Sequence, residues 1–344
     1  MTKLLEIKEQ VVRFCGEYEL YLKFVYKFVL ALALFCLINE SIGFMESIST
    51  FSIALLLALV CCLLPQGATL LVAAALVVIN LYVLSLEVAI TAALIFVLIF
   101  FLYFRFSPKD GVLFALTPIC FALHIPYVLP ICTGLLRKVY SVAAVACGTI
   151  IFYFLNGIYE NVTALQATSA GGEVEAAKMT ITVGQLLANK EMYLTVAVFA
   201  ISAIVVYGVR KMSIDHAWKV AIVSGALVQI SGLFVGYLLF DISGKTIGMI
   251  LGNIVAIVLG LVIEFLFMDL DYSRTERVQF EDDDYYYFVK AVPKKMVASS
   301  DKEIIQFSGF ATLDKLKDRR KKTEVPVSRK QIVEELDIED EYLD

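Results

Sequence analysis

The residues best placed to do chemistry lie in one proline-rich apolar segment. VLFALTPICFALHIPYVLPICTGLL covers residues 112–136 and contains one of the two histidines of the chain. Its three prolines remove backbone donors, so it cannot form one regular helix, and a broken helix exposes backbone polar groups that a cavity or a protein neighbour must satisfy. The side chains that could line a polar pathway there are Thr117, His124, Tyr127 and Thr133. The alternative is a kinked, buried segment whose histidine bonds a local carbonyl.

Other site chemistry is sparse. The sequence has no HExxH, GxSxG, P-loop or GxGxxG pattern, and its seven cysteines lie almost entirely in apolar segments without CxxC spacing. With two histidines, acid–base catalysis has few candidates. We therefore expect a protein that is not an enzyme and that has no cofactor and no metal site.

The composition indicates that the segments which position these residues lie in a lipid bilayer. Hydrophobic residues make up 60% of the 344 and charged residues 18%, values typical of integral membrane proteins. A complete crossing needs about 20 apolar residues. Segment 112–136 is overlong by this measure and segment 50–64 is marginal. The predicted crossings are 24–38, 50–64, 68–86, 88–104, 139–157, 193–209, 219–240 and 246–268.

Basic residues decide how segment 112–136 runs, because short cytoplasmic loops collect Lys and Arg. They cluster at 3–27, 105–109, 137–138 and 210–219 and in the tail. A single crossing would place Arg137 and Lys138 outside, whereas a re-entrant hairpin bent around residues 124–130 keeps every cluster cytoplasmic. The sequence therefore predicts an all-α polytopic membrane bundle of about eight transmembrane helices plus one Pro-rich re-entrant hairpin. Both termini are expected to be cytoplasmic at the cell membrane, with 158–192 an external connection that includes one short helix.

Small residues recur at a spacing of four in the last two predicted crossings. Because small residues let helix backbones approach in lipid, and only DISGK joins the two helices, we expect these faces to pack against each other. A sliding interface is the functional alternative. Glu264 is expected to be an interfacial anchor, and Gln229 and Asn253 to hydrogen-bond across the pair. The packing residues are Ser224, Gly232 and Gly236 in one helix, and Gly244, Gly248, Gly252, Ala256 and Gly260 in the other.

The sequence pattern divides the chain into an N-terminal cytoplasmic helix (1–20), a transmembrane domain (21–268), a β-hairpin region (269–307) and a disordered charged tail (308–344). In TERVQFEDDDYYYFVKAVPKK, two β-rich stretches flank an acidic turn, which predicts Arg277–Phe280 pairing with Tyr285–Val292 and ending at Pro293. In the tail, the basic run KLKDRRKK is typical of a segment that contacts a membrane surface. SRKQIVEEL then predicts a short helix at 328–336 that binds a partner. A solvated tail is the alternative.

RTERVQFEDDDYYYFVKAVPK, FSPKDG and IPYVLPICTGLL together resemble uncharacterised polytopic membrane proteins of Gram-positive anaerobic bacteria, some of which are loosely labelled permeases. The resemblance implies a multi-pass fold over most of the chain and assigns no site. We expect a non-enzymatic permease-type subunit, passive or driven by a partner, with a cytoplasmic docking tail. The alternative is an envelope-assembly or membrane scaffold that recruits a cytoplasmic partner and transports nothing. The expected partners are the lipid bilayer and a cytoplasmic protein, and no nucleic acid.

Overall fold

The protein is described from a computed structural model that covers residues 2–45, 48–163, 174–242, 244–268, 275–282 and 285–293. The chain divides into two compact units, 1–297 and 298–344, and all described residues belong to the first. The tail predictions, including the basic run and the helix at 328–336, therefore lie outside the described residues.

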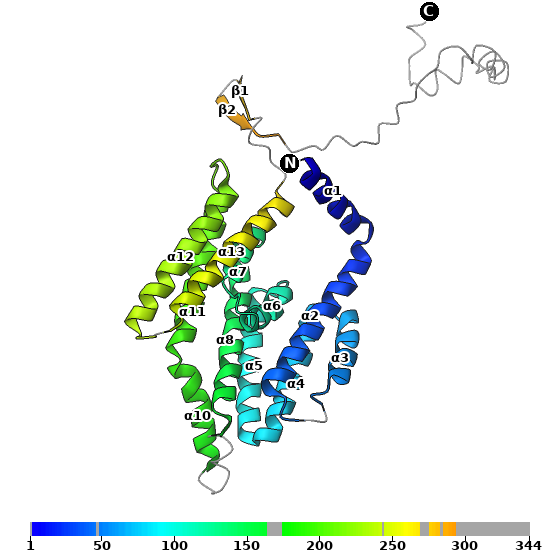
Figure 1. The fold of residues 1–344 in the computed structure, drawn as a ribbon, viewed down its shortest axis with the longest axis vertical. Helices are drawn as coiled ribbons and strands as arrows, with labels where there is room; N and C mark the ends of the chain where they lie inside the picture. Colours follow the sequence, from blue (N-terminus) through cyan, green and yellow to red (C-terminus); the bar gives the residue numbers. More distant parts are fainter. Residues whose placement is uncertain are drawn as a thin grey trace, which may run out of the picture. The chain divides into compact units, whose positions relative to one another are not determined.

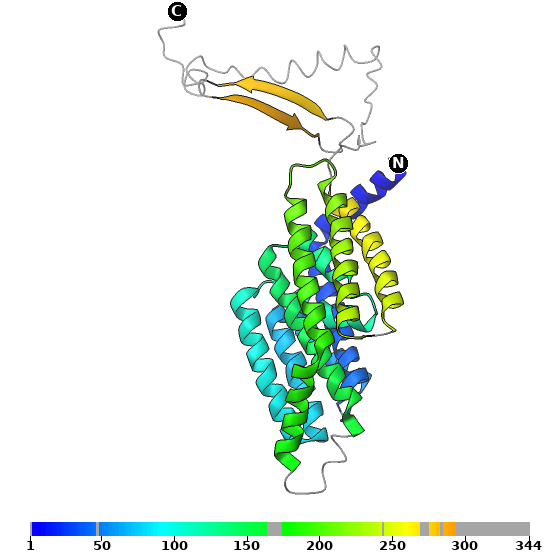
Figure 2. The ribbon, with the colours of Figure 1, turned by 90° about the vertical axis from the view of Figure 1, so that its left-hand side faces the viewer.

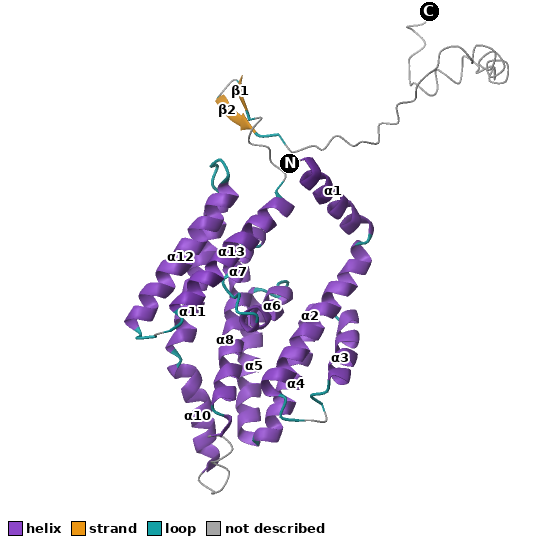
Figure 3. Cartoon of the chain, in the orientation of Figure 1, coloured by secondary structure: helices purple, strands orange, loops and turns teal. Residues whose placement is uncertain are grey.

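Within the described ranges, seven helices are long and apolar enough to cross a bilayer (Figures 1 and 3). This pattern is that of a multi-pass membrane protein, as the composition predicts. The seven are α2 (Glu19–Ile42), α4 (Gln66–Leu84), α5 (Leu86–Phe106), α8 (Val142–Glu160), α11 (Lys190–Arg210), α12 (Ala217–Leu239) and α13 (Thr246–Phe267). Shorter helices complete the bundle: α1 (Thr2–Glu17), α3 (Phe51–Leu63), α6 (Gly111–Ala122), α7 (Val128–Leu136), the 3₁₀ turn η1 (Val139–Ser141) and α10 (Val174–Ala188).

The segment predicted as an eighth full crossing, 50–64, forms α3, which has 13 residues and is therefore about 20 Å long. Pro65 ends it and directly precedes α4. The end of α3 lies beside α2, because Lys27 Nζ donates to the Leu64 carbonyl at 3.2 Å. Its start lies near Asn80, whose side-chain oxygen accepts from Ser49 Oγ at 3.2 Å. Helix α3 thus connects α2 to α4 and is too short to cross the bilayer completely.

The two ends of the membrane region meet at one side of the bundle. Lys8 Nζ of α1 donates to the carbonyl of Met268, directly after α13, at 3.0 Å. The connection between α11 and α12 lies at the upper end of these helices in Figure 1, and the connection between α12 and α13 lies at the lower end. Figure 2 shows α11 and α12 side by side, in agreement with their contacts. We call the end with Lys8 and Met268 the basic end.

The glycine row of α13 faces the α6–α7 segment and Ile222 of α12, and it does not meet a matching row of small residues. A Cβ built on Gly252 would lie 2.4 Å from the Tyr127 ring, and one on Gly260 would lie 3.1 Å from Ile222 and 3.3 Å from Ile131. Nothing lies within 4 Å of a Cβ on Gly248 or Gly244. The packing prediction is therefore wrong for these two. Gly244 instead has φ +85° in the turn before α13, a conformation that glycine adopts without strain.

The small residues of α12 pack mainly on α11. A Cβ on Gly232 would lie 3.0 Å from Val198, and one on Gly236 would lie 2.2 Å from Leu194. Ser224 is half-buried and bonds the Ala221 carbonyl of its own helix, whereas Ala256 of α13 is fully buried. The prediction that the small-residue faces of α12 and α13 pack against each other is therefore wrong, although the two helices are neighbours.

The two buried amides predicted to join α12 and α13 bond elsewhere. Gln229 Nε2 donates to Ser202 Oγ of α11 at 3.0 Å, and Ser202 in turn donates to the Gly225 carbonyl of α12 at 3.1 Å. Asn253 donates to the Met249 carbonyl of its own helix at 2.9 Å. Glu264 is half-buried in the last turn of α13, so its predicted role as an interfacial anchor stays a prediction.

The predicted β-hairpin is confirmed. Strands β1 (Glu276–Glu281) and β2 (Tyr286–Ala291) pair antiparallel, with Val278 opposite Val289. Every residue of both strands is exposed. Lys290 Nζ of β2 lies 2.5 Å from Oδ1 of Asp215, which is in the α11–α12 connection. The hydrogen bond from Lys290, together with the positive charge of the lysine, lowers the pKa of Asp215 below its usual value.

Candidate functional site

The proline-rich segment forms a helical hairpin whose two ends lie together. Helices α6 and α7 have 12 and 9 residues, which gives lengths of about 18 and 14 Å, well below a bilayer core. Asp110 before α6 and Arg137 after α7 form an ion pair, with Asp110 Oδ1 3.5 Å from Arg137 Nε. The Asp110 side chain is 3% exposed and that of Arg137 is 47% exposed. The chain therefore enters and leaves this hairpin at the basic end.

The prolines explain the shape of the hairpin. Pro118 lies inside α6 and cannot donate to the Phe114 carbonyl. Helix α8 packs against that carbonyl at Gly148, because a Cβ built on Gly148 would lie 3.0 Å from the Phe114 carbonyl oxygen. Pro130 falls in the first turn of α7, where the missing donor costs little. Between the helices, His124 turns the chain with φ 59°.

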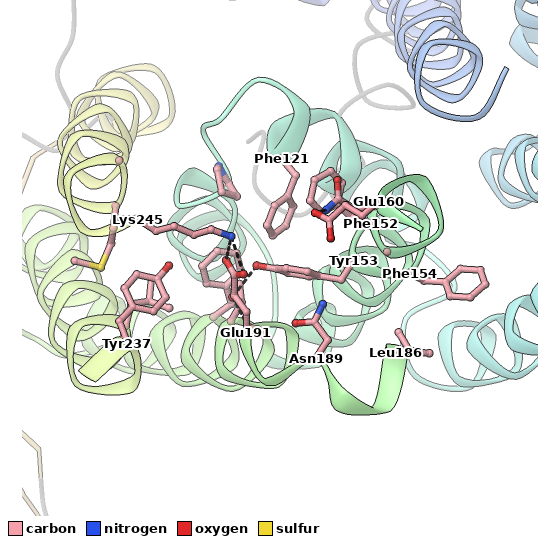
Figure 4. A pocket seen from close by; sticks show the side chains of 18 of the residues that line it. Phe121, Phe152, Tyr153, Phe154, Glu160, Leu186, Asn189, Glu191, Tyr237 and Lys245 are labelled. Carbon is pink, nitrogen blue, oxygen red and sulfur yellow. Dashed lines mark hydrogen bonds and ion pairs between the residues drawn. The ribbon is translucent and has the colours of Figure 1, made fainter. Parts of the chain in front are cut away.

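The bend borders a cavity of about 680 Å³, which we call the polar cavity. This volume is within the range of about 300–1,000 Å³ found for ligand sites. It is lined by the bend, α8, α10, the start of α11, the end of α12 and the start of α13 (Figure 4). Its polar side chains are His124, Tyr127, Tyr153, Asn156, Glu160, Thr182, Gln185, Asn189, Glu191, Thr195, Tyr237 and Lys245.

An ion pair crosses the polar cavity. Lys245 Nζ lies 2.9 and 2.7 Å from the two carboxylate oxygens of Glu191. Figure 4 shows Tyr153 and Tyr237 pointing toward this pair from opposite sides. Local sequence positions Glu191, because the Asn189 side chain caps α11 by accepting from the Met192 amide at 3.0 Å, and an acidic residue in the first turn suits the helix dipole.

The remaining polar groups are partly engaged with one another. Tyr153 OH lies 3.2 Å from Thr195 Oγ1, and Asn156 Nδ2 donates to Glu160 Oε1 at 2.8 Å. Gln185 of α10 donates to the Gly157 carbonyl of α8 at 2.8 Å. The lining thus presents carboxylates, amides and hydroxyls, all of which accept hydrogen bonds and most of which also donate them.

The structure brings together two of the four predicted pathway residues. His124 and Tyr127 line the polar cavity. Thr117 and Thr133 do not; both are buried, and Thr117 donates to the Leu113 carbonyl of its own helix at 2.7 Å. Pattern analysis missed Glu191 and Lys245, which sit at helix starts next to short connections. A usable signal was that NKE and SGK both fall in connections that the predicted topology places on the external side.

Within the described part of the chain, no three His, Cys, Asp or Glu side chains gather as a metal site would require. Comparison of the sequence and fold with protein families, with curated proteins and with solved structures found no match.

Proposed function

We propose that the protein is a non-enzymatic permease-type membrane subunit whose ligand site is the polar cavity. The observation that carries the proposal is the helical hairpin: a pair of half-length helices, anchored at the basic end by Asp110–Arg137, whose bend opens into a polar cavity of about 680 Å³. Backbone that breaks inside a membrane domain is tolerated where it lines such a cavity.

The cavity faces away from the cytoplasm in this proposal. The basic end carries Arg105, Lys109, Arg137, Lys138, Arg210 and Lys211, which the positive-inside rule assigns to the cytoplasm. The polar cavity is lined by the opposite ends of α8, α11, α12 and α13. The hairpin is therefore re-entrant from the cytoplasm, and its bend forms the floor of an outward-facing site.

A buried apolar cluster separates the polar cavity from the basic end. Its members lie on α7 and on the facing sides of α11, α12 and α13 and are at most 8% exposed, so a solute would reach the cytoplasm only after these helices move. We call this set the α7 cluster: Val128, Ile131, Leu135, Val206, Ala221, Ile222, Ala226 and Ala256. The described state would then be open outward and closed inward, and a permease must have a second state with the opposite access.

The test is two-sided labelling of the bend. In a background without native cysteines, His124→Cys is expected to react with an impermeant thiol reagent from outside and, at a slower rate, from inside, because a permease exposes one site to both faces in turn. The native side chain is exposed, so the substitution itself is tolerable. The reaction is followed by mass shift in oriented vesicles. Labelling from outside alone, over hours and at raised temperature, would contradict transport.

One observation favours a different function, a scaffold that recruits a cytoplasmic protein. The β-hairpin exposes Val278, Phe280 and Phe288, the last at 80%, and a two-stranded sheet alone is marginal in water. We propose that it docks a protein partner, which in a permease would also be the driving subunit. One-sided labelling at position 124 would leave this docking role as the main function.

A further inference from the structure

The polar cavity has an apolar neighbour with which it shares a wall. A second cavity, of about 410 Å³, lies between α2, α4, α5, α6 and α8, and we call it the apolar cavity. Phe121, His124, Phe152 and Asn156 line both cavities. The two cavities therefore adjoin at the hairpin bend, and a molecule that fills both must pass between these four side chains, of which His124 and Asn156 are exposed.

The two linings differ in chemistry. Away from the junction, the apolar cavity is walled by aliphatic and phenylalanine side chains, among them Leu34, Val77, Phe96 and Phe114. Its other polar side chains, Glu40, Ser41 and Tyr159, come from the C-terminal ends of α2 and α8. Phe114 and Ala122 both line this cavity and are eight residues apart in α6, so the apolar lining extends for about 12 Å along that helix.

The charge of the polar cavity restricts which polar group fits it. Its ionised side chains are Glu160, Glu191 and Lys245, and both carboxylate oxygens of Glu191 already engage the ammonium group. Among the described lining residues, two carboxylates accompany one lysine that is already paired, so a phosphate or carboxylate would meet a net negative lining there. An uncharged group rich in hydroxyls would instead find acceptors and donors on the amides and tyrosines. The rings of Phe121 and Phe152, with centroids 4.6 Å apart, add flat apolar surface at the junction.

We propose that the ligand is a single-chain amphiphile with an uncharged, hydroxyl-rich head, of the glycolipid class. The head occupies the polar cavity, the chain occupies the apolar cavity along α6, and Asn156 and His124 mark the boundary between them. The proposal rests on the proposed function in taking the polar cavity as the ligand site. Binding is measured without a transport step, so it can fail or succeed independently of two-sided labelling.

Dodecyl maltoside with a brominated chain is a suitable probe, because bromine quenches tryptophan fluorescence on contact. Trp218 is the one tryptophan of the chain, so Trp218→Phe gives a silent background. Leu155→Trp then reports on the apolar cavity, and Leu37→Trp serves if that variant does not fold; both positions line the cavity and are half-buried. Leu98→Trp, at a position 63% exposed on α5, reports on the bulk lipid.

In nanodiscs below the solubilising concentration, the cavity reporter is expected to show saturable quenching that unbrominated dodecyl maltoside reverses, whereas the lipid reporter shows only linear quenching. Ala74→Phe fills the apolar cavity and Asn156→Ala removes an amide at the junction. Each is expected to raise the half-saturating concentration about tenfold, the equivalent of about 1.4 kcal/mol. The matched control Ala75→Phe, on the exposed side of α4, should leave it unchanged.

Three results would overturn the proposal. Equal competition by dodecylphosphocholine would mean that the head is not recognised and that the cavity takes ordinary lipid. Competition by maltose alone at the same concentrations would mean a purely polar ligand. Linear quenching at both reporters would mean that no amphiphile site exists.

Discussion

Gly252→Leu is expected to lower the stability of the membrane domain by about 2 kcal/mol or more, whereas Gly248→Leu leaves it unchanged. At Gly252 a Cβ would already lie 2.4 Å from the Tyr127 ring, so a leucine forces α13 away from the hairpin bend. Gly248 lies one turn earlier on the same helix, is exposed, and has nothing within 4 Å of its Cβ position. The two variants therefore add the same side chain to the same helix in different environments.

Thermal unfolding in detergent, followed by the loss of monodisperse protein, measures the difference. A second pair of glycines, one in α12 and one in α11, extends the comparison, because an added Cβ at Gly236→Ala meets Leu194 whereas one at Gly208→Ala meets nothing within 4 Å. Equal melting temperatures for the two α13 variants would contradict the placement of α13 on the hairpin bend.

Arg137→Gln is expected to destabilise the protein by about 2 kcal/mol, because it leaves the Asp110 carboxylate, 3% exposed, without its ion-pair partner. The figure is below that of a fully buried pair, since Arg137 itself is 47% exposed. Lys138→Gln, which removes the neighbouring charge, should have little effect. The same unfolding measurement applies.

Adding Asp110→Asn to Arg137→Gln should recover most of the lost stability, because the unpaired charge is then absent. A double variant no more stable than Arg137→Gln would show that the arginine acts through other contacts. It would also remove the strongest link between the two ends of the hairpin.

Two elements could be predicted from the sequence because a short stretch of residues specifies each of them: the proline-rich hairpin and the β1–β2 pair. Three prolines within one apolar segment excluded a single regular helix, and the basic residues at 105–109 and 137–138 predicted a hairpin that returns to the side from which it enters. The alternation around an acidic turn gave the β1–β2 pairing, with Phe280 opposite Tyr287. The prolines and the strand alternation act through backbone geometry, which depends little on distant parts of the chain, whereas the basic clusters act through the side of the membrane on which each loop lies.

The choice of neighbours could not be predicted in this way. A four-residue period shows which glycines share a face of α13, but it does not show that Gly252 on this face meets Tyr127 of the hairpin bend and that Gly260 meets Ile222 of α12. The Glu191–Lys245 pair joins residues 54 positions apart, and neither helix start differs locally from an ordinary interfacial end. Such sites arise only when the helices are placed relative to one another.

The proposed permease function requires that the hairpin enters and leaves at the basic end and that the polar cavity opens at the opposite end of the bundle. Single cysteines at positions 109, 138 and 245, in a background without the seven native cysteines, test this in oriented vesicles with an impermeant thiol reagent. Lys109→Cys and Lys138→Cys are expected to react from the cytoplasmic face only, and Lys245→Cys, at the rim of the polar cavity, from the outer face. Labelling of positions 109 and 138 from opposite faces would contradict the re-entrant hairpin, and with it the outward-facing site.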